Sequence, residues 1–92
     1  MGKKISVTRK HSLPLDVATQ KLGELSKQFA EKYNIQFTVS GQTVDFKRSG
    51  VEGEARVTAD SVTISLELGL LLGALSGKIE DGVRAQLEKH FA

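Results

Sequence analysis

The sequence has no cysteine and no tryptophan, one proline, and five phenylalanine and tyrosine residues among its 92. Without cysteine the chain forms no disulfide, offers no thiolate site for zinc or an iron–sulfur cluster, and has no thiol nucleophile. Its apolar runs fall far short of the ~20 residues that cross a bilayer. The basic start leads into alternating residues rather than the apolar stretch of a signal peptide. We therefore expect a soluble protein with no transmembrane segment and no visible secretion signal.

Length and composition indicate a single globular domain over residues 1–92. Apolar residues make up 39% of the chain and charged residues 26%, which are ordinary globular values. The formal net charge is +2, but four basic residues fall within the first eleven: Lys3, Lys4, Arg9 and Lys10. Such residues can protect an edge strand from aggregation or attract a polyanion, and the first interpretation is favoured.

Hydrophobic periodicity predicts the element order β-α-β-β-β-β-α. Residues 4–10 alternate as in a half-buried strand, whereas residues 15–33 repeat at spacings of three and four, as in a helix. Ser12 is the expected N-cap of this helix, and Asn34 its left-handed terminator. Four further alternating segments follow, at residues 35–39, 44–46, 51–57 and 62–68. From about Leu71 to Phe91 the period is helical again.

Connectivity predicts how these elements pair. The first helix returns the chain and short turns join the later strands, so the first strand is antiparallel to the fifth. The result is an α+β fold with one antiparallel sheet of order 2-3-4-5-1 and both helices on one face. This topology resembles a reduced helix-grip. The opposite face would be polar, and we expect it to carry Ser6, Thr8, Gln36, Thr38, Asp45, Lys47, Glu52, Glu54, Arg56, Thr63, Ser65 and Glu67.

Three stretches carry a resemblance to a known family. They are His11-Ser12-Leu13-Pro14, the run from Phe46 to Gly53, and the run from Leu68 to Glu80. Together, in order and spacing, they are similar to the small bacterial polyhydroxyalkanoic acid system proteins. The resemblance implies a place in polyhydroxyalkanoate storage, in the cytoplasm near the granules. It supplies no catalytic residues to carry over.

The start of the first helix contains the residue types of a catalytic triad, in His11, Ser12 and Asp16. Neighbours at a strand-to-helix junction seldom point at one another, and the chain lacks a G-x-S-x-G nucleophile elbow. A structural junction is therefore favoured. Its alternative role is to bind an anion through Arg9, Lys10 and His11.

Metal and nucleic-acid sites have little support in the sequence. It contains two histidines, and Glu52 and Glu54 on one strand face are typical solubility charges. The aromatic residues fall on the apolar phases, where they cannot stack on bases. We expect no enzyme, no cofactor, no metal and no specific nucleic-acid partner.

The run from Leu68 to Gly77 is the most unusual local feature. Gly69, Gly73 and Gly77 are spaced by four, and we expect Gly69 to end a strand, Gly73 to lie in a connection and Gly77 to let the last helix pack tightly on the sheet. Consecutive leucines cannot all face inward from one turn. The predicted apolar binding or interface residues are Leu70, Leu71, Leu72 and Leu75.

Two functions remain open on the sequence. The favoured one is a non-enzymatic protein of the polyhydroxyalkanoate system that binds through an apolar surface. Its partner would be the granule surface, a lipid-like ligand or a granule-associated protein. The alternative is a homodimeric structural or regulatory module without a small ligand, which would bury the same leucines symmetrically.

Overall fold

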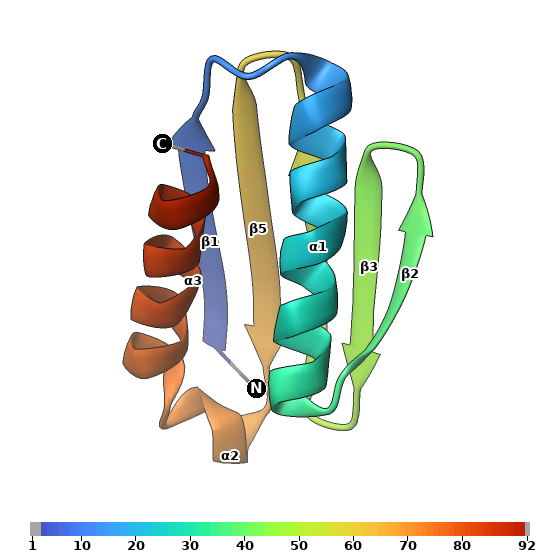
Figure 1. Ribbon diagram of the computed structural model, residues 1–92. Coiled ribbons are helices and arrows are strands. Elements are labelled where there is room, and N and C mark those ends of the chain that lie inside the picture. Colours follow the sequence, from blue (N-terminus) through green and yellow to red (C-terminus); the bar gives the residue numbers. More distant parts are fainter. Residues whose placement is uncertain (1–2, 92) are drawn as a thin grey trace.

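The protein folds as one five-stranded antiparallel sheet with two long helices on one face (Figure 1). The structure is a computed structural model that describes residues 3–91, and the side chains of Leu70 and Leu71 lie outside that description. The elements are β1 (Lys3–Lys10), α1 (Leu15–Tyr33), β2 (Gln36–Ser40), β3 (Thr43–Arg48), β4 (Val51–Val57), β5 (Ser61–Leu68), α2 (Leu70–Gly73) and α3 (Ser76–His90). The predicted order β-α-β-β-β-β-α is confirmed, with one added helical turn at α2.

The sheet has the predicted strand order, since its strands run β1-β5-β4-β3-β2 with every neighbouring pair antiparallel. Helix α3 lies over β1, and α1 lies over β4 and β3, so that β5 is visible between the helices in Figure 1. Both helices therefore share the position that one long helix holds in a helix-grip. The face away from them carries the expected polar side chains, because each alternates with an inward apolar neighbour.

The core lies between this sheet and the two helices. It is built from the inward-facing residues of the strands and from the three- and four-residue repeats of the helices. On α3 the buried residues are Ile79, Val83 and Leu87, followed by Phe91 just past the helix. Phe29, Tyr33 and Phe37 are partly buried against the same cluster. The prediction that the aromatic residues belong to the core is confirmed.

The start of α1 differs from the prediction. The helix begins at Leu15 with Pro14 in the N-cap position, and no side chain caps it. The expected Ser12 cap is wrong, because Pro14 adopts the extended conformation that precedes a helix and thereby moves the first turn beyond the reach of Ser12. The far end is as expected, since Asn34 is left-handed at φ 54° and its N–H bonds back to the Ala30 carbonyl.

The passage from β5 to the last helix also differs from the prediction. One helical turn, α2, precedes α3, and Leu75 is the N-cap residue of α3 rather than part of its buried stripe. Gly69 follows the last residue of β5, as expected. The explanation offered for Gly77 is wrong, because a β-carbon there would meet no atom within 4 Å. Within residues 3–91, no helix is long and apolar enough to cross a membrane.

Candidate functional site

Two of the three family-like stretches meet at the end of the molecule where α2 lies. Gly69, at the end of β5, donates its N–H to the Gly50 carbonyl in the β3–β4 turn, at 2.7 Å. Gly50 has φ +86°, and a β-carbon at Gly69 would lie 3.3 Å from Gly50 Cα. Glycine is therefore favoured on both sides of this contact, by its positive φ at Gly50 and by the close approach of the backbones at Gly69.

The C-terminal end of α1 closes onto the same turn. Arg48, the last residue of β3, donates from Nη1 to the Tyr33 carbonyl at 2.6 Å. Tyr33 is the last residue of α1, so the bond satisfies one of the carbonyls that a helix leaves unpaired at its C-terminus, and the positive charge complements the helix dipole. The stem of Arg48 is thus fixed beside the opening between α1 and α2.

A cavity of about 140 Å³ lies inside this end of the molecule. Helix α1 forms one wall, the inward faces of β4 and β5 form the floor, and α3 forms the opposite wall. The apolar lining from these elements consists of Phe29, Tyr33, Ile35, Val51, Leu66, Leu68 and Ile79. Arg48 and Lys78 also line the cavity, and none of the described residues around it is acidic.

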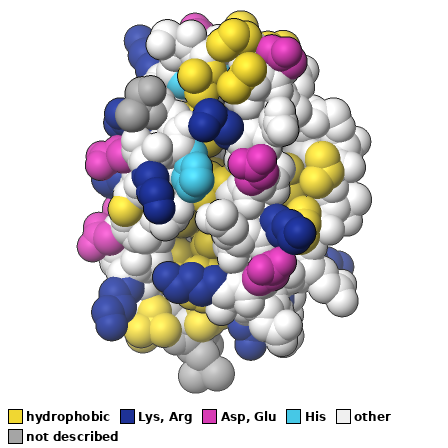
Figure 2. Space-filling view, in the orientation of Figure 1, with side chains coloured by type: hydrophobic (Ala, Val, Ile, Leu, Met, Phe, Trp, Pro, Cys, Tyr) yellow, Lys and Arg dark blue, Asp and Glu magenta, His cyan; other side chains and the backbone are white. Residues whose placement is uncertain are grey.

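The cavity continues as a groove between α1 and α3. A neighbouring depression of about 180 Å³ shares Phe29 and Tyr33 with it and extends along the helices past Leu25 and Val83. Figure 2 shows apolar side chains in the floor of this groove, with charged residues on the helix surfaces to either side. The two helices therefore leave part of the core open to solvent instead of closing over it.

The predicted leucines lie at the open end of the cavity. Leu72 is half-buried and Leu75 is 49% exposed, and both line the cavity. Leu70 and Leu71 belong to the turn of α2, but their side chains lie outside the described residues. The structure thus brings Leu72 and Leu75 together at one site and leaves Leu75 available to a partner.

A larger hollow, of about 660 Å³, lies outside the same turn. It is open and lined by side chains of both charges, among them Lys47, Glu52 and Glu67. Mixed charge on a shallow surface is what a solvated sheet edge shows, so volume alone does not mark this hollow as a binding site. The smaller cavity is the one with an apolar interior, and Arg48 lines both spaces.

The third family-like stretch lies at the opposite end of the molecule, where His11 joins β1 to α1. The His11 ring is 8% exposed; its Nε2 lies 2.9 Å from the Thr58 carbonyl, and its Nδ1 accepts the Leu13 N–H at 3.1 Å. These partners assign the tautomer with its proton on Nε2. The ring also packs against Phe91 at 5.8 Å between centroids. Both nitrogens are occupied by backbone groups rather than by Ser12 or Asp16.

The expected anion site at this junction involves residues in different surroundings. Lys10 is exposed, whereas Arg9 alternates with it along β1 and is half-buried. Both His11 nitrogens are already bonded to backbone groups. Among residues 3–91, no group of three or more histidine, aspartate and glutamate side chains could hold a metal ion.

Sequence reasoning missed part of the cavity lining. Phe29 and Tyr33 were interpreted as core, and Arg48 and Lys78 were not considered as site residues. The sequence does contain a signal for a site at the end of the first helix. Tyr33 follows Phe29 by four residues, so it extends the apolar stripe of the helix, and its side chain ends in a polar hydroxyl that favours contact with solvent or a ligand. No local signal places Arg48 and Lys78 at one cavity, because they are thirty residues apart and come to it from different elements.

A sequence model of one protein family matches residues 5–91, and its description is "Putative polyhydroxyalkanoic acid system protein (PHA_gran_rgn)". The match runs from the third residue of β1 to the residue after α3 and therefore includes both ends of the molecule described above. Comparison with curated proteins and with solved structures gives no match.

Proposed function

Because the chain belongs to the polyhydroxyalkanoic acid system protein family, we propose that it is a non-enzymatic binding protein that attaches to the polyhydroxyalkanoate granule through the open end of its cavity. Its place of action is then the cytoplasm, at the granule surface. The family supports a role in the polyhydroxyalkanoate system, and the mode of attachment is our proposal.

The observation that carries the proposal is the position of Leu75. This side chain is 49% exposed beside a half-buried Leu72 and an apolar cavity, so a partner can cover it without unfolding the core. The polymer is an aliphatic polyester, and contact with its surface would remove apolar area from water. Covering half a leucine contributes about 1 kcal/mol, enough to change binding several-fold.

The non-enzymatic role is supported by the surroundings of the reactive side chains. His11 is engaged by two backbone groups, and Ser12 and Asp16 are exposed without a bond to it. A base that cannot reach its nucleophile does not form a hydrolytic triad.

The test is co-sedimentation with isolated granules. Leu75→Ser should lower the bound fraction about fivefold, in line with the loss of about 1 kcal/mol. Val39→Ser is the matched control, because Val39 is 53% exposed on β2 and lies far from the cavity. Its attachment should equal that of the wild type.

Two outcomes would contradict the proposal. One is equal attachment of the wild type and Leu75→Ser, which would remove this end of the molecule from the contact. The other is a wild-type homodimer in light scattering that Leu75→Ser converts to monomer without any granule binding by either form. That result would favour the homodimeric module.

A further inference from the structure

The two edge strands of the sheet, β1 and β2, differ in how they are protected against pairing with another strand. An edge strand has unpaired backbone N–H and C=O groups, and charged side chains or a covering helix usually prevent further pairing. β1 carries the cations Lys3, Lys4, Arg9 and Lys10, and α3 packs on it. β2 has the sequence QFTVS, which contains no charged residue. Only the β1 edge is therefore protected.

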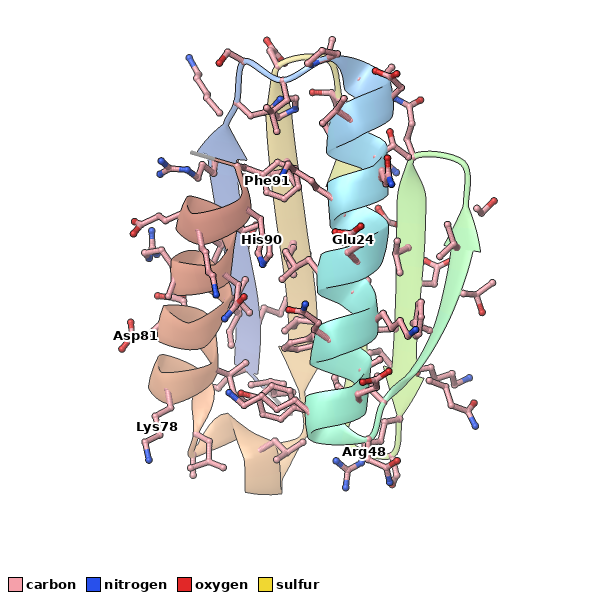
Figure 3. All side chains as sticks on the ribbon, in the orientation of Figure 1. Glu24, Arg48, Lys78, Asp81, His90 and Phe91 are labelled. Carbon is pink, nitrogen blue, oxygen red and sulfur yellow. The ribbon has the colours of Figure 1, made fainter. Side chains whose placement is uncertain are left out.

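β2 is also the least covered strand. None of its five residues is buried, whereas each of the other strands has at least two buried residues. Val39 lies opposite the buried Val44 of β3, which places it on the helix side of the sheet, yet it is 53% exposed. No described element lies in front of β2 in Figures 1 and 3, because α1 lies over β3 and β4. The helix side of β2 is therefore apolar and open to solvent.

The free backbone groups of β2 belong to Phe37 and Val39. Gln42, in the turn after β2, accepts a hydrogen bond from β4 through its carbonyl at 3.0 Å, so Gln42 faces β4. Because successive residues of a strand face opposite neighbours, the next residue, Thr43, faces β2. Its register partner Ser40 is therefore bonded to β3, and so is every second residue before it. The N–H and C=O groups of Phe37 and Val39 consequently point to the open edge.

The sequence of β2 is complementary to itself when two copies pair antiparallel. With a two-fold axis at Thr38, Phe37 lies opposite Val39 of the second copy, and the same pair recurs on the other side of the axis. These two residues carry the free backbone groups, so each such pair exchanges both of its N–H···O=C bonds. On the polar side, Gln36 lies opposite Ser40 and threonine lies opposite threonine. Aromatic residues with β-branched residues, and threonine with threonine, are favourable cross-strand pairs.

Charge does not oppose this pairing. The charged residues of β3 that lie beside β2 on the polar face are Asp45 and Lys47. In the joined sheet the two Asp45 side chains are three strand spacings apart, about 14 Å, which exceeds the screening length at physiological salt. Lys47 shares its row with the uncharged Thr43 of the second copy. Two β1 strands, by contrast, would bring their cations together.

We propose that β2 pairs antiparallel with β2 of a second copy of this chain, which joins the two sheets into one and leaves the helices of both copies on the same face. The inference goes beyond granule attachment and does not depend on it. The two-fold axis is perpendicular to the sheet, so the α2 ends of the two copies point in opposite directions. A flat surface therefore contacts one α2 end of a dimer at a time. The granule attachment expected of Val39→Ser is unchanged.

The first experiment is sedimentation equilibrium at protein concentrations from about 10 µM to 1 mM. Pairing over five residues a side gives an interface smaller than the standard ~1,600 Å², so we expect a weak dimer with a Kd on the order of 100 µM. Val39→Lys should raise this Kd at least about tenfold, because it places a charge on the helix side of the edge strand.

Two variants serve as controls in the same experiment. Val17→Lys adds the same charge in place of a 36% exposed valine on α1, and Leu75→Ser alters the open end of the cavity. Both should keep the wild-type Kd. Circular dichroism melts of each variant separate a change in association from a change in folding.

The second experiment tests the register, and it uses the absence of cysteine from the sequence. Thr38→Cys places the two thiols opposite each other at the axis, with Cα atoms about 4.5 Å apart, a separation that a disulfide can bridge. Mild oxidation at about 100 µM protein should convert most of this variant to a covalent dimer.

Gln36→Cys is the matched control for the register. It lies on the same face of the same strand, but its two copies are about 14 Å apart in the proposed pairing, too far for a disulfide. Its cross-linking should be at least about tenfold slower than that of Thr38→Cys. An equal mixture of Gln36→Cys and Ser40→Cys should form the mixed dimer, because these two residues lie opposite each other.

Three results would overturn the inference. They are a wild type that stays monomeric up to 1 mM, equal effects of Val39→Lys and Val17→Lys on the Kd, and cross-linking of Gln36→Cys as fast as that of Thr38→Cys. A dimer that Leu75→Ser dissociates would place the second copy at the cavity instead, and the edge pairing would be wrong. Granule binding by a protein that stays monomeric would reject the pairing and leave the proposed function standing. Dimerisation as expected without granule binding would contradict the attachment alone.

Discussion

At the scale of single residues, the imidazole of His11 holds together three segments that are distant in the chain. Its ring bonds the β4–β5 turn through Thr58 and the α1 approach through Leu13, and it packs on Phe91 beyond α3. A buried polar ring with both nitrogens satisfied stabilises one arrangement of these segments, because any other arrangement leaves a buried donor or acceptor without a partner.

His11→Ala should therefore lower the free energy of unfolding by about 3 kcal/mol, through two lost hydrogen bonds and a cavity beside Phe91. Ser12→Ala is the control, and it should change stability by less than about 0.5 kcal/mol because Ser12 is exposed and caps no helix. Urea unfolding of both variants measures the difference. Similar losses of unfolding free energy in the two variants would indicate that Ser12 caps α1 after all.

Ser26 on α1, unlike His11, is a buried polar residue whose side chain has no hydrogen-bond partner among the described residues. It is 1% exposed, and its Oγ forms no hydrogen bond with any residue that the structure describes. Ser26→Ala should raise the unfolding free energy by about 1 kcal/mol, since it removes a buried hydroxyl and introduces a better helix former. Ala18→Ser, at a 0% exposed position of the same helix, should act in the opposite direction. A destabilised Ser26→Ala in calorimetry would mean that the hydroxyl has a partner.

Residues such as these show where sequence reasoning ends. The apolar core residues were predictable because their spacing identifies their face. The bonds of His11 were not, because Thr58 and Phe91 are brought to it by the sheet and by α3 rather than by any local pattern. The same sequence motif is equally compatible with a cap, a catalytic base and a structural ring.

At the scale of elements, α2 and α3 illustrate how a contact between distant segments overrides a helical period. The spacing of four from Leu71 onward predicts one helix, but the bond from Gly69 to Gly50 fixes the end of β5 and turns the chain away before α3 begins. Leu75 therefore falls at the N-cap of α3 and stays exposed, while Ile79, Val83 and Leu87 keep the predicted phase and are buried.

The buried stripe of α3 gives a prediction at this scale. Val83→Asp should abolish cooperative unfolding or reduce stability by several kcal/mol, because Val83 is 4% exposed within the apolar core cluster and a carboxylate there would lose its hydration. Ala85→Asp, two residues along and exposed, should cost less than about 1 kcal/mol. Thermal melts followed by circular dichroism distinguish them. A near-wild-type melt of Val83→Asp would remove α3 from the core.

At the scale of the whole molecule, connectivity was enough to predict the sheet. Short turns force β2 to β5 into an antiparallel meander, and the reversal of direction between β1 and β5 allows them to pair. The cavity could not be derived in this way. Its walls come from both long helices, from three strands and from the α2 connection, and its existence depends on how far apart α1 and α3 settle.

On the uncovered sheet face, strand register places four charged residues in one row across the sheet, and this row appears only at the scale of the whole molecule. Glu67 and Glu52 are directly opposite each other on β5 and β4, and like charges in this position repel. Lys4 lies opposite Glu67 on the outer side, and Lys47 lies opposite Glu52 on the inner side. The row therefore reads positive, negative, negative, positive across four strands.

Lys4→Glu tests whether this row contributes to folding. The change would place three carboxylates in succession, and it should lower the unfolding free energy by about 0.5–1 kcal/mol at low ionic strength. Lys10→Glu changes the net charge equally but lies opposite Ser61, so it should have less than half that effect. Because the side chains are exposed, the difference between the two variants should fall toward zero in 1 M salt, where the screening length is ~3 Å. Urea unfolding at both ionic strengths measures it. If the two variants lose stability equally at low salt, net charge rather than register governs this face, and the polar surface serves solubility alone.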